Sequence, residues 1–441
     1  MNARVAHHVA AMFLTCSAPA FAQSSLQLPL QFDLLNPGAR SLALGSAFTG
    51  LADDATAGFS NPAGLTILQF PEISLEGRFR RVESASLAGG RLAGTVTNRG
   101  IDTMNGPQYE SHLDTSAGPS FISIVYPRAK WAIAGYRHEF VRVTQSFKSN
   151  GVFQDDSTRE QALKGDRELM MNAYGLSVAY RPASRIRLGA SVALYTAKMN
   201  AQFLRYDPPD FFAAPNYASE TFRSFSIQRG SAVDSVFSAG GLFTIKQGSD
   251  AGETAADLVL GIVYRQSGNF DFLAYEEDLF QSTTDARKNP TETLSIGLSS
   301  HATGSLTWAL DATHVRYSSL LSGYIGVKQP ADGVSRFQNF ILDDVTELHA
   351  GIEYVLPLGL SPAVRAGAWH DPNHLISYRP PSNPDQLDRL FAAYLPVSDD
   401  LIHLTFGIGL ALSSRYEINA AIDRSARTRV LSVSTVIRLA H

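Results

Sequence analysis

Residues 401–412, LIHLTFGIGLAL, decide the fold of this chain. Every second side chain in the stretch is large and apolar, and these are Ile402, Leu404, Phe406, Ile408, Leu410 and Leu412. The side chains between them, from His403 to Ala411, are polar or small. Because successive side chains of a strand point to opposite faces, this period of two predicts a β-strand with one apolar face. The other face then looks into something wet or closely packed.

The same alternation recurs along the chain from about residue 120 onward. Further copies lie at 174–180, 188–194, 294–298, 306–310, 348–356, 416–422 and 431–439. Strands of about ten residues with one apolar face are typical of transmembrane barrels, in which that face contacts lipid. Aromatic residues gather at the strand ends, and these are Tyr126, Trp131, Tyr180, Tyr354 and Trp369. They form either a girdle at the lipid head groups or caps on a soluble core.

Connection lengths favour the membrane barrel, because short periplasmic turns alternate with long outside loops in that architecture. Short links are expected at 127–129, 182–184, 303–304, 357–362 and 413–414, with a longer one at 247–255. Long polar segments are expected at 96–118, 143–168, 201–233, 269–290, 318–343 and 372–400. With a first strand between residues 71 and 95 and a last tight loop at Ala426-Arg427, the count closes at about 14 strands. The stretch Val82–Val96 is either a second strand or a bulged extension of the first.

Charge and hydropathy exclude several other classes of protein. The formal net charge of -4 supplies no basic field for a phosphate backbone, so we expect no nucleic-acid partner. No stretch approaches the roughly 18 uninterrupted apolar residues that a membrane-spanning helix needs. If the chain spans a membrane it does so with strands, since only helices and closed barrels satisfy every backbone group in lipid.

The N-terminus is typical of a secretory signal peptide over residues 1–22. Arg4 supplies the positive region, Val9–Thr15 the apolar region, and Ala20-Phe21-Ala22 the cleavage site. The single cysteine, Cys16, lies inside this peptide, and the residues before it lack the small side chain that lipoprotein processing needs. The processed chain therefore has no disulfide and no thiolate metal site.

Residues 23–70 do not alternate and are rich in Gly, Ala and Asn-Pro, which predicts a compact segment that folds against something else. The run PGARSLALGSAFTGLADD at 37–54, followed by NPAGL at 61–65, resembles the plug of the FadL/TodX outer-membrane transporters. That resemblance implies a hatch at 23–70 inside a 14-stranded barrel at 71–441, and transport of long-chain fatty acids or aromatic hydrocarbons. Barrels of secretion and surface-attachment systems share this opening, so that alternative stays open.

The Asn-Pro-Ala-Gly motif is the predicted gate of the hatch, formed by Asn61, Pro62, Ala63 and Gly64. Pro62 disfavours a helical conformation at the preceding residue, and the Asn61 side chain can cap a turn. Gly45, Asp53 and Asp54 are assigned to hatch turns. The two adjacent acids suggest a calcium-linked or proton-linked gate only weakly, and hydrogen bonding within the hatch is the favoured interpretation.

Two sets of residues are candidates for contact with a ligand. The loop at 201–233 is unusually aromatic, because it contains Phe211, Phe212, Tyr217, Phe222 and Phe225. These residues are expected either to form a capture groove on the outside or to pack the loop onto the barrel rim. Four arginines are placed away from lipid by the alternation, namely Arg187, Arg265, Arg365 and Arg415. Each is a candidate partner for a ligand carboxylate, although pairing with interior acids such as Glu347, Glu353, Glu417 or Asp423 is favoured.

The histidines are scattered without metal-ligand spacing, and no nucleophile elbow or P-loop is present, so no catalytic residue, metal or cofactor is expected. We therefore expect an all-β transmembrane antiparallel barrel of the cell outer membrane that takes up hydrophobic small molecules passively. Its expected partners are that ligand, outer-membrane lipid with lipopolysaccharide, and the barrel assembly machinery during biogenesis. An outer-membrane hydrolase is the least favoured alternative.

Overall fold

The computed structural model describes residues 34–156, 159, 162–207, 221–247, 257–266, 270–277, 282–288, 292–322 and 336–439. The predicted signal peptide and the first part of the predicted hatch, residues 23–33, lie outside the described residues.

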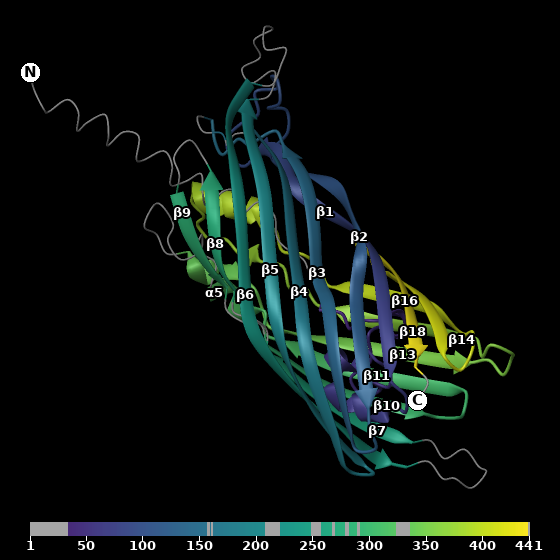
Figure 1. Cartoon of the computed structure of the whole chain (residues 1–441). Helices are drawn as coiled ribbons and strands as arrows, with labels where there is room; N and C mark the ends of the chain where they lie inside the picture. Colours follow the sequence, from purple (N-terminus) through teal and green to yellow (C-terminus); the bar gives the residue numbers. More distant parts are fainter. Residues whose placement is uncertain are drawn as a thin grey trace, which may run out of the picture.

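Fourteen strands within the described residues close into one antiparallel barrel (Figure 1). They are β1 (Glu72–Arg91), β2 (Gly106–Pro127), β3 (Trp131–Ser149), β4 (Ala162–Ala183), β5 (Ile186–Asp207), β6 (Thr221–Lys246), β7 (Leu258–Gln266), β10 (Glu292–His301), β11 (Leu306–Val315), β13 (Val345–Val355), β14 (Ala363–Asp371), β16 (Leu401–Ala411), β17 (Tyr416–Arg424) and β18 (Thr428–Arg438). Pairing of β1 with β18, from Glu72↔Arg438 to Val82↔Thr428, closes the barrel. The predicted fold class and strand count are confirmed.

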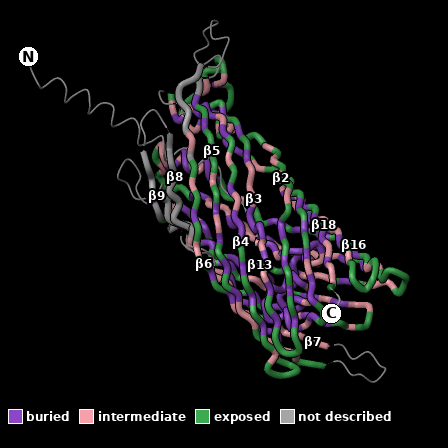
Figure 2. Tube along the Cα trace, viewed as in Figure 1, coloured by how far each residue is buried: buried purple, intermediate pink, exposed green. Residues whose placement is uncertain are grey.

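The outer face of the barrel is an apolar belt. In β16, Ile402, Leu404, Phe406 and Ile408 are between 53% and 58% exposed, whereas His403 and Thr405 between them are 1% and 0% exposed. Figure 2 shows the same alternation of buried and exposed residues along the other strands. Exposed apolar side chains over so wide a surface are unfavourable in water and favourable in lipid, so the belt marks a membrane-spanning barrel.

The predicted aromatic girdle is correct except at one residue. Tyr126, Trp131, Tyr180 and Tyr354 are exposed on the outer face. Trp369 is 3% exposed, and its indole N–H donates to Asp423 at 3.0 Å, so the prediction for this residue was wrong. Trp369 lies an even number of residues from Arg365, and strand geometry turns both side chains into the lumen.

The barrel is much taller on one side than on the other. Strands β1–β6 have 19–26 residues, whereas the other eight barrel strands have 9–11. Parts of the predicted outside loops at 96–118, 143–168 and 201–233 are therefore strand, because β1–β6 continue beyond the apolar belt. The stretch Val82–Val96 is resolved as an extension of β1 to Arg91, with a register shift between Leu87 and Gly89.

The predicted short links each join neighbouring strands at one end of the barrel, and the long connections leave from the opposite, outer end. A hairpin of β8 (Phe270–Glu277) and β9 (Ser282–Lys288) extends the sheet next to β6.

A cap covers the lumen above the short strands. It contains α5 (Ser318–Ser322), η2 (Phe337–Asn339), β12 (Phe340–Ile341), β15 (Ser377–Tyr378) and α7 (Gln386–Tyr394), and β12 pairs with β15. Helix α7 begins with a capping box between Asp385 and Asp388, and Arg336 forms ion pairs with both of these acids. Buried Tyr317 and Tyr378 lie in one apolar cluster with Leu87 and Val152, so the cap is packed against the tall side of the barrel.

Residues 34–70, here called the hatch segment, cross the lumen. They form α3 (Ala39–Ala43), α4 (Ala57–Ser60) and the 3-10 helix η1 (Pro62–Ile67). Helix α3 contacts β14 and β16–β18, whereas α4 and η1 contact the opposite wall, chiefly β3–β6. Among the described residues, no helix is long and apolar enough to cross a membrane.

Candidate functional site

The Asn-Pro-Ala-Gly motif forms a hydrogen-bonded corner of the hatch segment. Asn61 is extended, with φ -151° and ψ 101°, and its side-chain oxygen accepts from the Ala63 N–H at 3.2 Å, as the motif predicts. Its side-chain amide donates to the carbonyls of Thr49 at 2.9 Å and Gly241 at 3.3 Å. Asn61 is completely buried, so one side chain ties η1 both to the rest of the hatch segment and to strand β6.

Two glycines allow the hatch segment to fold closely. A Cβ on Gly64 would lie 1.9 Å from the Ala52 carbonyl oxygen, so a side chain there does not fit. Gly45 has φ +65°, the left-handed conformation that glycine adopts without strain. The barrel wall likewise lacks side chains where the hatch backbone contacts it, and the wall residues there are Gly261, Gly297, Gly351 and Gly367.

Hydrogen bonds fasten the hatch segment to the wall of short strands. Asp311 of β11 accepts from the backbone N–H groups of Phe48 and Thr49, both at 2.7 Å. The Thr405 hydroxyl of β16 accepts from the Gly45 N–H at 3.0 Å and donates to the Ala43 carbonyl at 2.9 Å. These contacts satisfy backbone groups that burial would otherwise leave unpaired.

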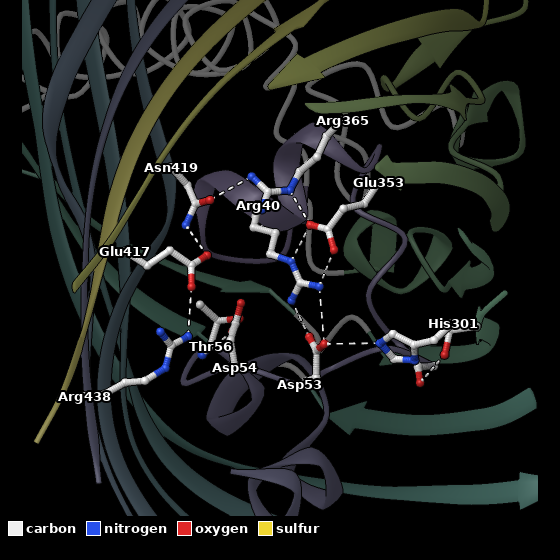
Figure 3. Close-up of polar contacts among 12 residues, drawn as sticks. Arg40, Asp53, Asp54, Thr56, His301, Glu353, Arg365, Glu417, Asn419 and Arg438 are labelled. Atoms are coloured by element: carbon white, nitrogen blue, oxygen red, sulfur yellow. Dashed lines mark hydrogen bonds and ion pairs between the residues drawn. The ribbon is translucent and has the colours of Figure 1, made fainter. Parts of the chain in front are cut away.

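A network of ion pairs reinforces the same wall (Figure 3). Arg40 of α3 bridges Asp53, at 2.5 Å, and Glu353 of β13, at 2.9 Å. Arg365 also pairs with Glu353, at 2.5 Å, and donates to Asn419 at 2.7 Å. The hatch segment and three barrel strands therefore share one charged cluster, which favours a single position for α3.

The two adjacent acids have separate roles within the hatch segment. Asp53 belongs to the Arg40 cluster, whereas Asp54 accepts from the Thr56 N–H at 2.8 Å and from its hydroxyl at 2.5 Å. Burial raises the pKa of the Asp54 carboxyl to about 6, although Arg40 and Thr56 act in the opposite direction. Over the residues that the structure describes, no group of three or more acids, histidines or cysteines is arranged to hold a metal ion.

The four candidate arginines are dispersed. Arg365 is in the ion-pair network, and Arg265 donates to the Phe59 carbonyl at 2.8 Å while its guanidinium lies 4.2 Å from the Phe59 ring centroid. Arg187 lies at the short-turn end of β5, where it reaches the Thr244 hydroxyl at 3.5 Å. Placing Arg415 in the lumen was wrong: it is exposed in the turn between β16 and β17, where strand alternation no longer holds.

The aromatic capture loop is only partly described. Phe211, Phe212 and Tyr217 lie outside the described residues. The backbone at Phe222 and Phe225 belongs to strand β6 and pairs with β5, so the prediction that they lie in a loop was wrong. The tall side of the barrel continues as sheet to this height, because both strands are more than twice as long as a membrane crossing requires.

The wall of long strands is apolar where it faces the hatch segment. A single cluster of buried side chains joins Phe59 of α4 to Phe121, Tyr136, Phe140, Tyr195 and their neighbours on β2–β6. The wall of short strands therefore holds the hatch segment with ion pairs and hydrogen bonds. The wall of long strands holds it with this apolar packing and with hydrogen bonds from Ser123 to the Ala55 carbonyl and from Ser177 to the Gly58 carbonyl.

A cavity of about 630 Å³ lies at the outer end of the lumen, between the hatch segment, the cap, β1–β3 and the β17–β18 turn. Its apolar lining consists of Leu35, Val82, Ala85, Tyr109, Val143, Leu375, Tyr394, Pro396, Val397, Ala426 and Val430. Its charged lining residues are Arg80, Glu83, Asp114, Arg142 and Arg427. Arg142 is engaged by Glu139 at 2.7 Å, whereas the Arg427 guanidinium has no hydrogen-bond or ion-pair partner among the described residues. The cavity thus combines a largely apolar surface with the Arg427 cation, and Glu83 and Asp114 are acidic groups in the same lining.

The barrel wall has a seam beside this cavity. Among the described residues, the β2–β3 ladder runs only from Pro127↔Ala132 to Phe121↔His138. Beyond this pair β3 has a register shift between Glu139 and Val141, and the two strands are joined by the Ser146 N–H, which donates to the Asp114 carboxylate at 3.0 Å. The upper wall between β2 and β3 therefore lacks the backbone ladder found elsewhere in the barrel.

Sequence reasoning missed two residues of this region. Arg427 lies in the predicted tight loop at Ala426-Arg427, but nothing local indicates that the turn faces a cavity. His138 is completely buried in the apolar cluster, and the alternation Trp131, Ile133 outward and Ala132, Ala134 inward would have placed it in the lumen.

These features define a class of protein: a closed, membrane-spanning β-barrel whose lumen is crossed by residues 34–70. The chain has the fold of the FadL-type transporters. A FadL homologue of Pseudomonas aeruginosa is similar with a TM-score of 0.62 and 13% identity, over 93% of this chain and 99% of that chain. The Pseudomonas putida toluene transporter TodX gives 0.56 and 13%, over 93% of this chain and 100% of that chain. The Ralstonia pickettii toluene transporter TbuX gives 0.55 and 13%, over 92% and 100%. The sequence matches no protein-family model and no curated protein.

Proposed function

We propose that this protein is an outer-membrane channel for the passive uptake of hydrophobic small molecules, and that residues 23–70 are its hatch. The observation that carries the proposal is the cavity of about 630 Å³ above the hatch segment, whose surface is largely apolar and which lies at the outer end of the lumen. A volume of this size is typical of sites for small organic ligands. Similarity in fold to toluene transporters supports the same conclusion.

The proposed ligand is a fatty acid or an aromatic hydrocarbon. Leu35, Val82 and Val430 provide apolar contact for the body of such a molecule, and Arg427 is positioned to receive a carboxylate if one is present. The candidate arginines from the sequence are less suitable, since Arg365 and Arg265 are already engaged by the barrel and the hatch segment. Arg427 therefore replaces them in the proposal.

Onward movement from the cavity has two available routes. One passes the hatch along the wall of long strands, away from the ion pair that joins Arg40 to Glu353 on the opposite wall. The other passes through the seam between β2 and β3, where few backbone hydrogen bonds have to break. The driving force is the concentration difference, because the outer membrane offers no nucleotide. In this setting the belt contacts lipid and lipopolysaccharide, and insertion requires the barrel assembly machinery.

Uptake by cells that lack the gene tests the proposal. We expect the initial rates of radiolabelled oleate and toluene uptake at limiting concentration to fall on deletion and to recover with the wild-type gene. Ser116→Trp, which fills the cavity, should not restore uptake, whereas Ser413→Trp in the exposed short turn should. Arg427→Gln should reduce oleate uptake more than toluene uptake. Unchanged rates after deletion would favour a secretion or attachment barrel instead.

A further inference from the structure

His138 is a buried polar group without a polar partner. Its side chain is completely buried, and among the described residues neither ring nitrogen has a hydrogen-bond partner. An imidazole removed from water in this way destabilises the fold unless something else satisfies it. An apolar side chain of similar size would pack at this position without that cost.

Aromatic rings surround the His138 imidazole. The ring centroid of Phe59, from the hatch segment, lies 4.4 Å away at an interplanar angle of 78°. Those of Phe121 and Phe140 lie 5.7 Å and 6.3 Å away. The Phe59 and Phe121 contacts are edge-to-face and the Phe140 contact is tilted, and aromatic rings favour such arrangements over face-to-face stacking. We call His138 and these three phenylalanines the aromatic box.

The aromatic box lies where both proposed routes begin. His138 and Phe121 form the last pair of the β2–β3 ladder, directly below the seam. Phe59 is the hatch residue that packs on the apolar wall. Val143 both lines the cavity and packs against the same cluster, so the box and the cavity adjoin. The aromatic box is therefore next to the cavity and to the start of both proposed routes.

We propose that the aromatic box is a binding station for neutral hydroxylated aromatic compounds, the phenols. This inference rests on the proposed function and narrows its substrate class. A neutral imidazole has one donor and one acceptor nitrogen, which match a hydroxyl group that both donates and accepts. The phenylalanines hold the ring of the ligand, and His138 hydrogen-bonds its hydroxyl in place of the missing protein partner.

Binding to the purified full-length protein in detergent tests the station with 4-bromophenol and bromobenzene as probes. Calorimetry should show that His138→Leu raises the Kd of 4-bromophenol about five- to tenfold, the effect of one lost hydrogen bond, and changes the Kd of bromobenzene less than about twofold. His138→Gln, which keeps a donor and an acceptor, should restore most of the affinity. His112→Leu is the matched control, because His112 bonds Ser86 on strand β1 instead.

Anomalous diffraction from bromine locates the probe independently. In crystals of the wild-type protein soaked with 4-bromophenol, we expect a bromine peak between the phenylalanines, and its loss in His138→Leu. Bromine only at other sites, an equal loss of affinity for both probes, or no rescue by His138→Gln would overturn the inference. Failure of the proposed function is recognised separately, as cellular uptake that does not depend on the gene while binding at the box persists.

Discussion

Replacing Asn61 with Ala should loosen the hatch without unfolding the barrel. The change removes three hydrogen bonds of a fully buried side chain, to the Thr49 and Gly241 carbonyls and from the Ala63 N–H. At about 1 kcal/mol for each bond, the closed hatch loses roughly 3 kcal/mol relative to open states. Because about 1.4 kcal/mol corresponds to a factor of ten, the open population should rise roughly a hundredfold.

Hydrogen exchange followed by mass spectrometry measures this change directly. Amides of the hatch segment that exchange through local opening should exchange roughly a hundredfold faster in Asn61→Ala, while amides of the barrel strands stay protected. Asn339→Ala is the matched control, since it removes one hydrogen bond, to the Tyr378 hydroxyl, in the cap. Hatch exchange within about threefold of both wild type and control would refute the argument from these hydrogen bonds.

Three further perturbations test the anchoring of the hatch segment. Thr405→Val, nearly isosteric, leaves the Ala43 carbonyl without its hydroxyl donor and should speed exchange near α3 about tenfold, whereas Thr313→Val, which faces Ser295, should not. Gly64→Ala places a methyl group against the Ala52 carbonyl and should prevent η1 from docking, so that proteases cleave the hatch segment; continued resistance would contradict the geometry. The pKa of Asp54 in the folded protein is about 6, which is above its value in the unfolded chain, so protonation favours the docked hatch segment. Protection of the hatch amides from hydrogen exchange should therefore be greatest below about pH 4 and decline as the pH rises through 6. Asp54→Asn should abolish that decline.

The sequence predicts the barrel well because the relevant signal is local. In 401–412 each residue's face is decided by its neighbours, and the lipid-facing residues found there are those expected. The capping role of Asn61 could also be predicted, since its side chain accepts a hydrogen bond from a backbone N–H only two residues along the chain. Trp369 was misassigned because its aromatic character was given more weight than its position in the strand, which it shares with Arg365.

The contacts that hold the hatch could not be predicted from the sequence. Arg40 and Glu353 are separated by 313 residues, and their pairing depends on how the segment crosses the lumen. The place of Arg427 beside the cavity likewise follows from the three-dimensional arrangement, because an arginine in a tight turn is usually exposed. The local sequence determines only the face of the strand to which each side chain points. Which interior groups contact one another depends on how the whole barrel closes.

The bare stretches of wall at Gly261, Gly297, Gly351 and Gly367 limit how such a protein can be redesigned. Deleting the N-terminal segment would not yield an open version of the same tube, since the inner surface would present naked peptide groups where other barrels present side chains. Widening the conduit would therefore require rebuilding both surfaces together. For the same reason we expect the barrel wall to keep its shape only with residues 34–70 in place.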